Sequence, residues 1–310
     1  MMVPLIDPVE PRLIEPELRR DRYVCSLKGI DMYILSAAEA PNTMREIGRI
    51  REREFRAVGA GRNLATDIED FDLAPNLCRQ LVAWDPVNRQ VVAMYRFVLC
   101  GEALERRGLR GLRTSGLFDF SDAFVEQYLR RAIELARSVV NSQARRAVLG
   151  LFAVWQGLGA LVNEYPEVRY FFGNITVYRT MSPDGRDLLL AFLRKHYAAP
   201  PGLVTAKAGL AYAPRTPPEA LAALFPGPNA AADQRRLVEG LSRQGDTVPP
   251  ILLSYLGVTR ELLVFDMAAD RDFGDAYELA LTIPIASVNG RTRERFVSGY
   301  RRAAGGYFDR

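Results

Sequence analysis

The segment Leu77–Leu99, LCRQLVAWDPVNRQVVAMYRFVL, decides the fold class of this chain. Two stretches rich in β-branched and aromatic residues, Leu77–Trp84 and Gln90–Leu99, predict strands. Residues 85–89 between them, DPVNR, contain the Asp, Pro and Asn that favour a turn. We therefore expect a β-hairpin, and with it antiparallel pairing inside the sheet.

Helices and strands alternate on both sides of this hairpin. Further strands are expected at 31–37, 132–140, 169–178, 261–266 and 277–285, and helices at 39–58, 121–130, 147–164, 182–196 and 230–243. Hairpins within a helix–strand alternation favour a mixed sheet over a doubly wound parallel one. We expect an α/β (α+β) fold with a largely antiparallel sheet and helices on both faces.

One stretch interrupts this pattern and suggests how the chain is divided. Residues 198–229 are rich in Ala, Pro and Gly and are interpreted as a linker. The linker separates a core of residues 1–197 from a C-terminal segment, 230–310, which is expected to pack on the core or complete it.

Composition and charge limit the class of protein. The chain has 310 residues, 48% of them hydrophobic, and a net charge of +4, which fits an anionic partner or has no functional meaning. The basic residues alternate with acids and form no known nucleic-acid module, so no nucleic-acid partner is expected. Without a signal peptide or an 18-residue apolar run, we expect a cytoplasmic protein, with peripheral membrane contact left open.

A single histidine removes several reaction classes. A Ser-His-Asp site, a Cys-His site and most zinc sites would all need His196, which we expect to be a surface residue at a helix end. The three cysteines, Cys25, Cys78 and Cys100, have no CxxC spacing and are interpreted as buried thiols. Carboxylates or backbone groups would then provide the acid–base chemistry of an enzyme, and no metal site is expected.

Four features occur in a fixed order. Arg51-x-x-x-Phe55 places two side chains one helical turn apart. The acidic run Glu69–Asp72 follows, then Arg96 inside an apolar strand, and then Glu134 to Arg137 in the stretch IELAR.

With these features the sequence resembles the hemolysin-like branch of the GNAT-related N-acyltransferases. That branch includes ornithine and glycine N-acyltransferases, which make N-acyl amino acid lipids, and is related in fold to the acyl-homoserine lactone synthases. The resemblance covers residues 32–196 through RIREREFRAVGAGRN, DIEDFDL, LVAWD, VVAMYRF and IELARS. VPPILLSYL at 248–256 and DFG at 272–274 match more loosely.

The resemblance implies roles for these residues. Glu134 would be the general base, or orient it, with Arg137 as its structural partner. Arg51 and Phe55 would shape the pocket for the amine. Glu69 and Asp72 would form an acidic lip that holds Arg51 and Arg96.

The resemblance also implies the substrates. A fatty, or β-hydroxy fatty, acyl group would move from acyl carrier protein, or from acyl-CoA, to the α-amine of glycine or ornithine, without a cofactor. Residues 141–150, NSQARRAVLG, lack the glycine-rich loop that holds the CoA pyrophosphate in GNAT enzymes, which favours a carrier protein. Arg145 and Arg146 would meet the acidic surface of that carrier.

The chemistry is compatible with this interpretation. An ammonium group must lose a proton before it attacks a thioester, and a carboxylate within hydrogen-bond reach can accept that proton. Backbone N–H groups at separated strands can stabilise the oxyanion.

Several alternatives stay open. The charged residues could be a buried ion network, Glu134 and Arg137 an ordinary ion pair, and Tyr170, Phe171 and Phe172 core residues instead of an acyl tunnel. The chain could also be a non-enzymatic module that binds lipid or acyl carrier, or an acyltransferase for another amine or a lysolipid.

Overall fold

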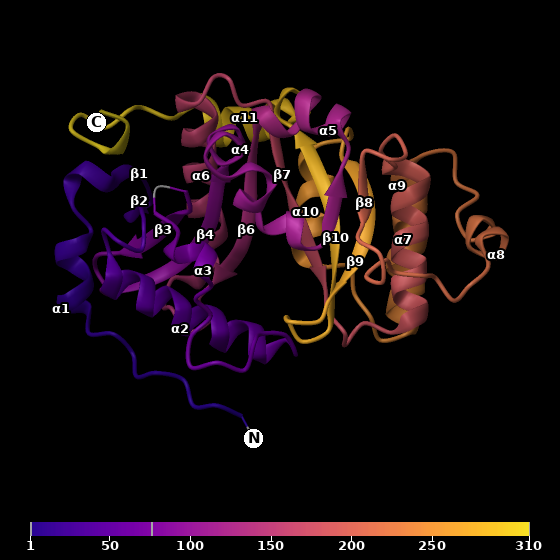
Figure 1. The fold of residues 1–310 in the computed structure, drawn as a ribbon, viewed down its shortest axis with the longest axis horizontal. Coiled ribbons are helices and arrows are strands. Elements are labelled where there is room, and N and C mark those ends of the chain that lie inside the picture. The colour runs from indigo at the N-terminus through magenta and orange to yellow at the C-terminus, as the bar shows by residue number, and fades with distance from the viewer. Residues whose placement is uncertain (1, 76, 310) are drawn as a thin grey trace.

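The computed structural model describes residues 2–75 and 77–309. A single eight-stranded sheet runs through the molecule in the order β1-β2-β3-β4-β6-β7-β10-β9 (Figure 1). Its strands are β1 Tyr23–Leu27, β2 Ile30–Leu35, β3 Arg79–Asp85, β4 Gln90–Leu99, β6 Ala132–Val140, β7 Tyr170–Val177, β9 Leu263–Asp270 and β10 Ala276–Pro284. Every neighbouring pair is antiparallel except β6 and β7. The expected mixed, largely antiparallel fold is confirmed.

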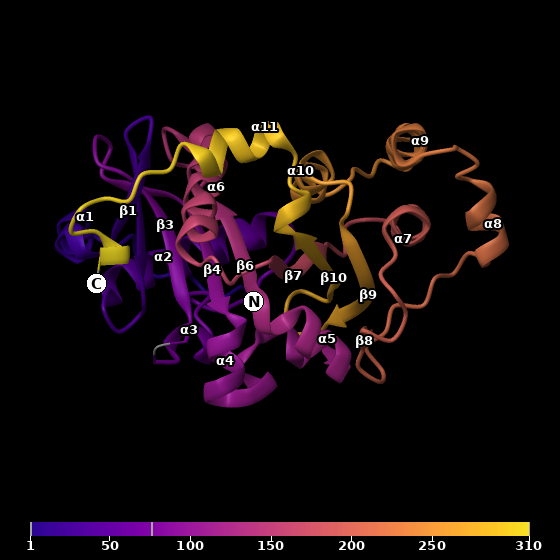
Figure 2. The same cartoon turned by 90° about the horizontal axis from the view of Figure 1, so that it is seen from above.

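Helices cover both faces of the sheet. They are α1 Pro11–Ile14, α2 Pro41–Ala57, α3 Asp70–Leu73, α4 Cys100–Arg107, α5 Asp122–Gln127, α6 Ala147–Glu164, α7 Pro183–Tyr197, α8 Pro218–Ala223, α9 Ala230–Arg243, α10 Pro250–Val258 and α11 Gly290–Arg293. Seen from above, α6, α10 and α11 lie on one face, whereas α4 and α5 lie on the other (Figure 2). A small second sheet pairs β5, Phe118–Phe120, with β8, Val204–Ala206.

Local sequence signals explain where several elements begin and end. In the β3–β4 turn, Asp85 Oδ1 accepts hydrogen bonds from the backbone N–H groups of Val87 and Asn88, at 3.0 and 3.2 Å. The Ser182 hydroxyl caps α7 by accepting a hydrogen bond from the Gly185 N–H at 3.0 Å. Side chains therefore satisfy the first free backbone donors of these elements.

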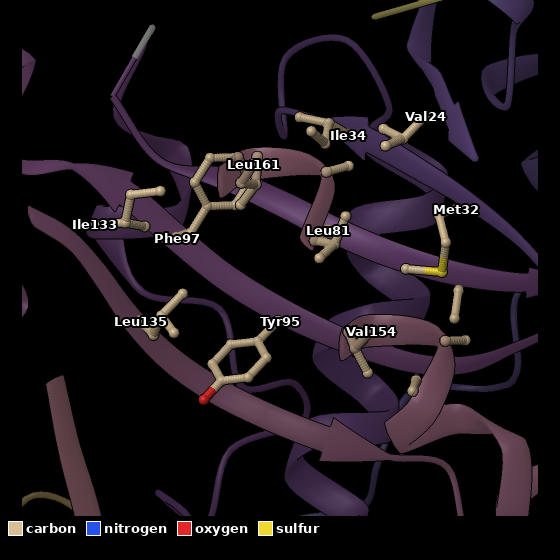
Figure 3. Packing of buried hydrophobic residues seen from close by; sticks show 14 of the residues in the cluster. Val24, Met32, Ile34, Leu81, Tyr95, Phe97, Ile133, Leu135, Val154 and Leu161 are labelled. Carbon is tan, nitrogen blue, oxygen red and sulfur yellow. The ribbon is translucent and has the colours of Figure 1, made fainter. Parts of the chain in front are cut away.

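One large core lies between α6 and the sheet. Val154 and Leu161 of α6 pack against Leu81, Phe97 and Ile133 from three strands (Figure 3). Among the described residues, α6 is the one helix long and apolar enough to span a membrane by length and composition. Here it packs as a core helix on the sheet.

Two expectations about local structure need correction. The sequence predicted a first strand at 31–37, whereas β2 is preceded by β1, which pairs with it as a hairpin. His196 is not a surface residue: its side chain is 10% exposed, and its Nε2 lies 3.0 Å from Asp233 Oδ2. The helix end is covered because α9 packs against α7 and supplies Asp233.

The C-terminal part of the chain is integrated into the main sheet. Residues 198–229, the expected linker, contain β8 and α8. Beyond them, β10 pairs along the whole length of β7, and β9 forms the sheet edge.

Candidate active site

The strands β6 and β7 separate after a short parallel pairing. They pair only from Ala132 to Leu135 on β6 and from Tyr170 to Gly173 on β7. A side chain at position 173 cannot fit here, because its Cβ would lie 2.3 Å from the Leu135 carbonyl oxygen. Beyond this point the facing edges of the two strands have no strand partner, and the strands diverge (Figure 1).

Arg137 lies where β6 turns away from β7. Its φ of 53° is in the left-handed region, and the register between β4 and β6 shifts between Met94 and Arg96. The extra residue on β6 therefore forms a bulge, which bends the strand and opens the gap.

A buried network of charges lies beside this gap, on the face of the sheet away from α6. Arg51 of α2 donates to Asp72 Oδ1 at 3.0 Å and to Gln80 Oε1 at 2.5 Å. Asp72 also closes a capping box with Glu69 at the start of α3. One helical turn thus fixes the two carboxylates that hold the arginines.

Glu69 is the centre of the network because it pairs with three arginines. Its carboxylate oxygens lie 2.6 Å from Arg96, 3.3 Å from Arg113 and 3.2 Å from Arg137. Arg113 also pairs with Asp270 at 2.8 Å, and Arg137 also pairs with Asp67 at 2.9 Å. Glu69 therefore ties β4, β6 and the turn at Arg113 to the start of α3.

The ionisation of these carboxylates follows from burial and from the guanidinium groups. Burial opposes the charge of Glu69, but Arg96, Arg137 and Arg113 outweigh it and lower the pKa. For Asp72, Arg51 and Arg96 likewise outweigh burial and lower the pKa to about 2. Asp67 differs, since burial dominates and raises its pKa.

Phe55 lies beneath Arg137. Its ring packs edge-to-face on Phe273 with centroids 4.8 Å apart, and the Arg137 guanidinium lies 5.4 and 4.3 Å from the two centroids. Phe55 and Arg51, one turn apart on α2, thus both support the arginine network.

Glu134 is buried and fully hydrogen-bonded. One oxygen accepts from the Thr114 N–H and hydroxyl at 2.9 and 2.6 Å, and the other from the Arg113 N–H at 3.0 Å. These contacts hold the 3₁₀ turn η4, Arg113–Gly116, against β6. The geometry favours a structural contact that positions Arg113.

The expected pairing of Glu134 with Arg137 is not present among the described residues. Arg137 instead pairs with Asp67 and Glu69. The two side chains have other partners: Asp67 and Glu69 engage the Arg137 guanidinium, and donors of residues 113 and 114 engage the Glu134 carboxylate.

Three adjoining cavities surround the gap. The arginine cavity, about 50 Å³, is lined on one face of the sheet by Arg96, Arg113, Glu134, Asn174, Asp270 and Glu278, among others. The splay cavity, about 240 Å³, shares Leu135, Ala136, Arg137, Asn174 and Thr176 with it. The cavities therefore meet across the separated strands.

The apolar cavity continues from the splay cavity on the other face. It measures about 80 Å³ and lies between α6, α10 and the sheet. Leu135 and Tyr255 line both cavities, and the Tyr255 hydroxyl is 2.6 Å from that of Tyr95. Of the three aromatic residues in the β7 strand, Phe171 lines the apolar cavity, whereas Phe172 is a core residue beneath α5.

The basic residues proposed for carrier docking differ in their surroundings. Arg145, at the start of α6, is exposed. Arg146 is half-buried and donates to the backbone oxygens of Lys28 and Gly29 in the β1–β2 turn. Because β6 leads into α6 and the antiparallel β4 leads into α4, Arg106 and Arg107 lie at the opposite end of the sheet.

The thiols are poorly suited to attack a thioester. Burial raises the pKa of the Cys25 and Cys78 thiols to about 12, and raises that of the Cys100 thiol well above its usual value. Nor do the described residues contain a group of three or more His, Cys, Asp or Glu side chains that could hold a metal ion.

Sequence reasoning missed several residues of the arginine cavity. These are Arg113, Asn174, Asp270 and Glu278. The available signal was a charged residue within a strand: Glu278 lies in the otherwise apolar run YELALTIPI.

Comparisons with known proteins identify relatives of this chain. The acetyltransferase (GNAT) domain model matches residues 50–155. The chain is 35% identical to a glycine N(alpha)-acyltransferase of Bacteroides thetaiotaomicron, over 96% of this chain and 91% of that protein. It is 32% identical to a protein of the same name from Phocaeicola vulgatus, over 96% and 94%.

Two solved structures of CoA-dependent acyl-homoserine lactone synthases are also similar. MesI matches with a TM-score of 0.34 at 12% identity, covering 86% of this chain and 96% of that one. BjaI matches with a TM-score of 0.35 at 11% identity, covering 89% and 97%. On the sequence identity to the two bacterial acyltransferases, over almost the whole of each chain, this protein is an acyltransferase and belongs to the GNAT-related N-acyltransferase family.

Proposed function

We propose that the protein transfers a fatty acyl group from a carrier-protein thioester to the α-amine of a small amino acid, with glycine favoured over ornithine. One observation carries the proposal: an arginine-lined cavity and an apolar cavity meet at the gap between β6 and β7. The carboxylate of an amino acid needs the arginine-lined cavity, and a fatty chain needs the apolar cavity.

The arginine cavity suits a carboxylate. Arg96 is 2% exposed, and its Nη2 has no hydrogen-bond partner among the described residues. A buried guanidinium donor without a partner is costly, and a bound carboxylate would satisfy it with a charge-assisted hydrogen bond. We infer that Arg96 holds the carboxylate of the acceptor.

The size of the cavity and the charges of the acidic loop favour glycine. A water needs roughly 10–15 Å³ of such space, so about 50 Å³ accommodates only a few non-hydrogen atoms. Glu69 and Asp72 are engaged by arginines, and Asp70 is exposed, so the acidic loop offers no spare carboxylate to a side-chain ammonium. The curated relatives are named as glycine acyltransferases, which supports the same choice.

The donor would bind with its thioester in the splay cavity and its chain in the apolar cavity. Backbone N–H groups along the unpaired edges of β6 and β7 are suited to stabilise the oxyanion of the tetrahedral intermediate. Arg145 lies at the end of β6 where the gap opens, and its charge suits an acidic carrier protein. The site needs no group other than the two substrates.

The test is a reconstitution with defined substrates. Purified protein is mixed with glycine, ornithine or a lysolipid and with the same acyl chain on carrier protein or on CoA, and acyl amides are measured by mass spectrometry. N-acylglycine formed faster from the carrier supports the proposal. N-acylornithine would change the acceptor, and equal rates from CoA would remove the carrier. No acylated product from any acceptor would contradict the proposed function.

A further inference from the structure

Among the carboxylates of the arginine cavity, Glu278 differs from the others in its contacts. The three that line the cavity are Glu134, Asp270 and Glu278. Glu134 has both oxygens occupied by three donors, and Asp270 is paired with Arg113 at 2.8 Å. Glu278 has no ion pair among the described residues.

Glu278 is buried but has one unengaged oxygen. Its side chain is 6% exposed and lies on β10 opposite Thr176 of β7, whose hydroxyl donates to Oε1 at 2.9 Å. No hydrogen bond from a described residue reaches Oε2. The Thr176 contact fixes the carboxylate while the second oxygen stays available.

The position of Glu278 relative to the gap suits a proton acceptor. Thr176, its hydrogen-bond partner, lines both the arginine cavity and the splay cavity, as does Asn174. Asn174 Oδ1 is buried and has no hydrogen-bond partner among the described residues. An acceptor with its carboxylate on Arg96 would therefore find two free oxygen acceptors, Asn174 Oδ1 and Glu278 Oε2, on the β7–β10 side of the same cavity.

We infer that Glu278, and not Glu134, takes the proton from the acceptor ammonium; this rests on the proposed N-acyltransferase function. The carboxylate accepts one proton, which leaves the neutral amine. The amine nitrogen forms the C–N bond to the thioester carbon, and the C–S bond then breaks. The departing sulfur takes the second proton from nitrogen and leaves as the thiol, and Glu278 returns its proton to solvent.

The charges around Glu278 agree with this role. Burial raises its pKa to about 7, and Asp270 on β9 adds to the rise, whereas the Thr176 hydrogen bond, Arg113 and Arg137 lower it. Tyr178, the residue after β7, also interacts with Glu278 electrostatically, and its own pKa is raised to about 12, chiefly by burial and then by Glu278. A base whose pKa lies near the working pH is efficient, because it is ionised and still binds a proton well.

The experiment compares Glu278→Gln with Glu134→Gln in the full-length protein. Turnover of glycine is measured from pH 5.5 to 9 at saturating donor, with thermal unfolding as the folding control. Loss of a general base typically lowers turnover by about 10²–10⁴-fold. We expect that loss for Glu278→Gln, together with loss of an inflection that we expect near pH 7 in the wild type.

A second acceptor separates proton removal from structural damage. Aminooxyacetate keeps the carboxylate of glycine, but its amine is uncharged at neutral pH and needs no initial deprotonation. Glu278→Gln should lose far less activity with aminooxyacetate than with glycine, whereas a variant that merely disturbs the site should lose both equally.

The outcomes distinguish this inference from the proposed function. If the wild type acylates no amine, the function itself is wrong. If the wild type is active and Glu278→Gln keeps both its glycine turnover and its pH inflection, the inference is overturned. The inference is also overturned if only Glu134→Gln loses turnover and the inflection. Should the Gln variant not fold, Glu278→Asp serves instead: reduced turnover with a retained inflection supports the inference, and wild-type turnover overturns it.

Discussion

The two faces of the sheet at the β6–β7 gap hold opposite environments. On the α2 side, four arginines and their carboxylates form a buried ion network around Glu69. On the α6 side, side chains such as Trp155, Leu158 and Phe171 line a cavity whose wall is almost wholly apolar. Leu135 of β6 lines both the apolar cavity and the arginine cavity.

This contrast matches the two substrates of the proposed function. A charged amino acid needs paired, hydrogen-bonded surroundings, and a fatty chain needs a dry apolar wall. The sheet keeps these environments apart except where β6 and β7 part. The charged side should therefore respond to pH and to charge substitutions, and the apolar side to side-chain volume.

The largest expected effect is acid destabilisation through the charged side. The folded pKa of Asp72, about 2, is below the unfolded value of about 3.9, so its contribution is complete above pH 4–5 and is lost as pH falls toward 2. At about 1.4 kcal/mol per pKa unit, Asp72 alone contributes roughly 2–3 kcal/mol. Glu69 acts in the same direction, and Asp67, whose pKa is raised, acts in the opposite one.

Urea unfolding between pH 7 and pH 2 measures this loss. Asp72→Asn is the matched variant: it should be less stable than the wild type at pH 7 and should lose less stability on acidification. A free energy of unfolding that stays constant from pH 5 to pH 2.5 in the wild type would show that the network does not stabilise the fold through ionisation.

Arg96→Lys should weaken acceptor binding with a smaller change in stability. The lysine keeps the positive charge beside Glu69 and Asp72 but loses the planar fork that a carboxylate needs. Hydrogen bonds to charged groups are worth about 1.5–3 kcal/mol, so KM for glycine should rise about 10-fold to 100-fold. Unchanged KM in a folded variant would remove Arg96 from the acceptor site.

Val162→Phe should change chain-length preference on the apolar side. Val162 lines the apolar cavity, and a larger ring there would displace methylenes of the acyl chain. Each excluded methylene is worth about 0.8 kcal/mol, or roughly fourfold in kcat/KM for long donors. The KM for glycine should not change.

The same helix offers the control for that substitution. Val148 is 83% exposed at the start of α6 and lines none of the three cavities, so Val148→Phe should leave the preference unaltered. If the chain-length preference shifts in both Val162→Phe and Val148→Phe, or in neither of them, the apolar cavity is not the site of the acyl chain.

The smallest effect is expected at the surface. Arg145→Glu should lower kcat/KM with acyl carrier protein a few-fold at low salt, and the difference should shrink near 1 M salt, where the Debye length is about 3 Å. Arg106→Glu, at the opposite end of the sheet, is the control. An equal loss with acyl-CoA would show that Arg145 does not act through the carrier.

The sequence predicted the elements whose signals are local. The β3–β4 hairpin follows from its turn residues, the strand 132–140 from its Val-rich end and the helix 147–164 from its long apolar run, and the structure has them at those positions. β1 was missed because five residues, YVCSL, are too few for a clear period. His196 was misplaced because its burial depends on α9, which comes 34 residues later in the chain.

The candidate site was predictable only as a set of residue types. The order of Arg51, Glu69, Asp72 and Arg96 indicated charged residues in one region, because an arginine inside an apolar strand needs a partner. Sequence spacing could not reveal that Glu134 is occupied by the η4 turn, since Thr114 lies 20 residues away.

By itself, then, the sequence determined the sheet-and-helix pattern and the charges that must be buried together, since both depend on local periodicity and on the cost of burying a charge alone. The tertiary structure decided which carboxylate is free. Glu134 meets backbone donors on η4, whereas Glu278 on the distant β10 meets one hydroxyl and an open cavity. That difference arises because the long-range pairing of β10 with β7 brings residue 278 to the gap between β6 and β7.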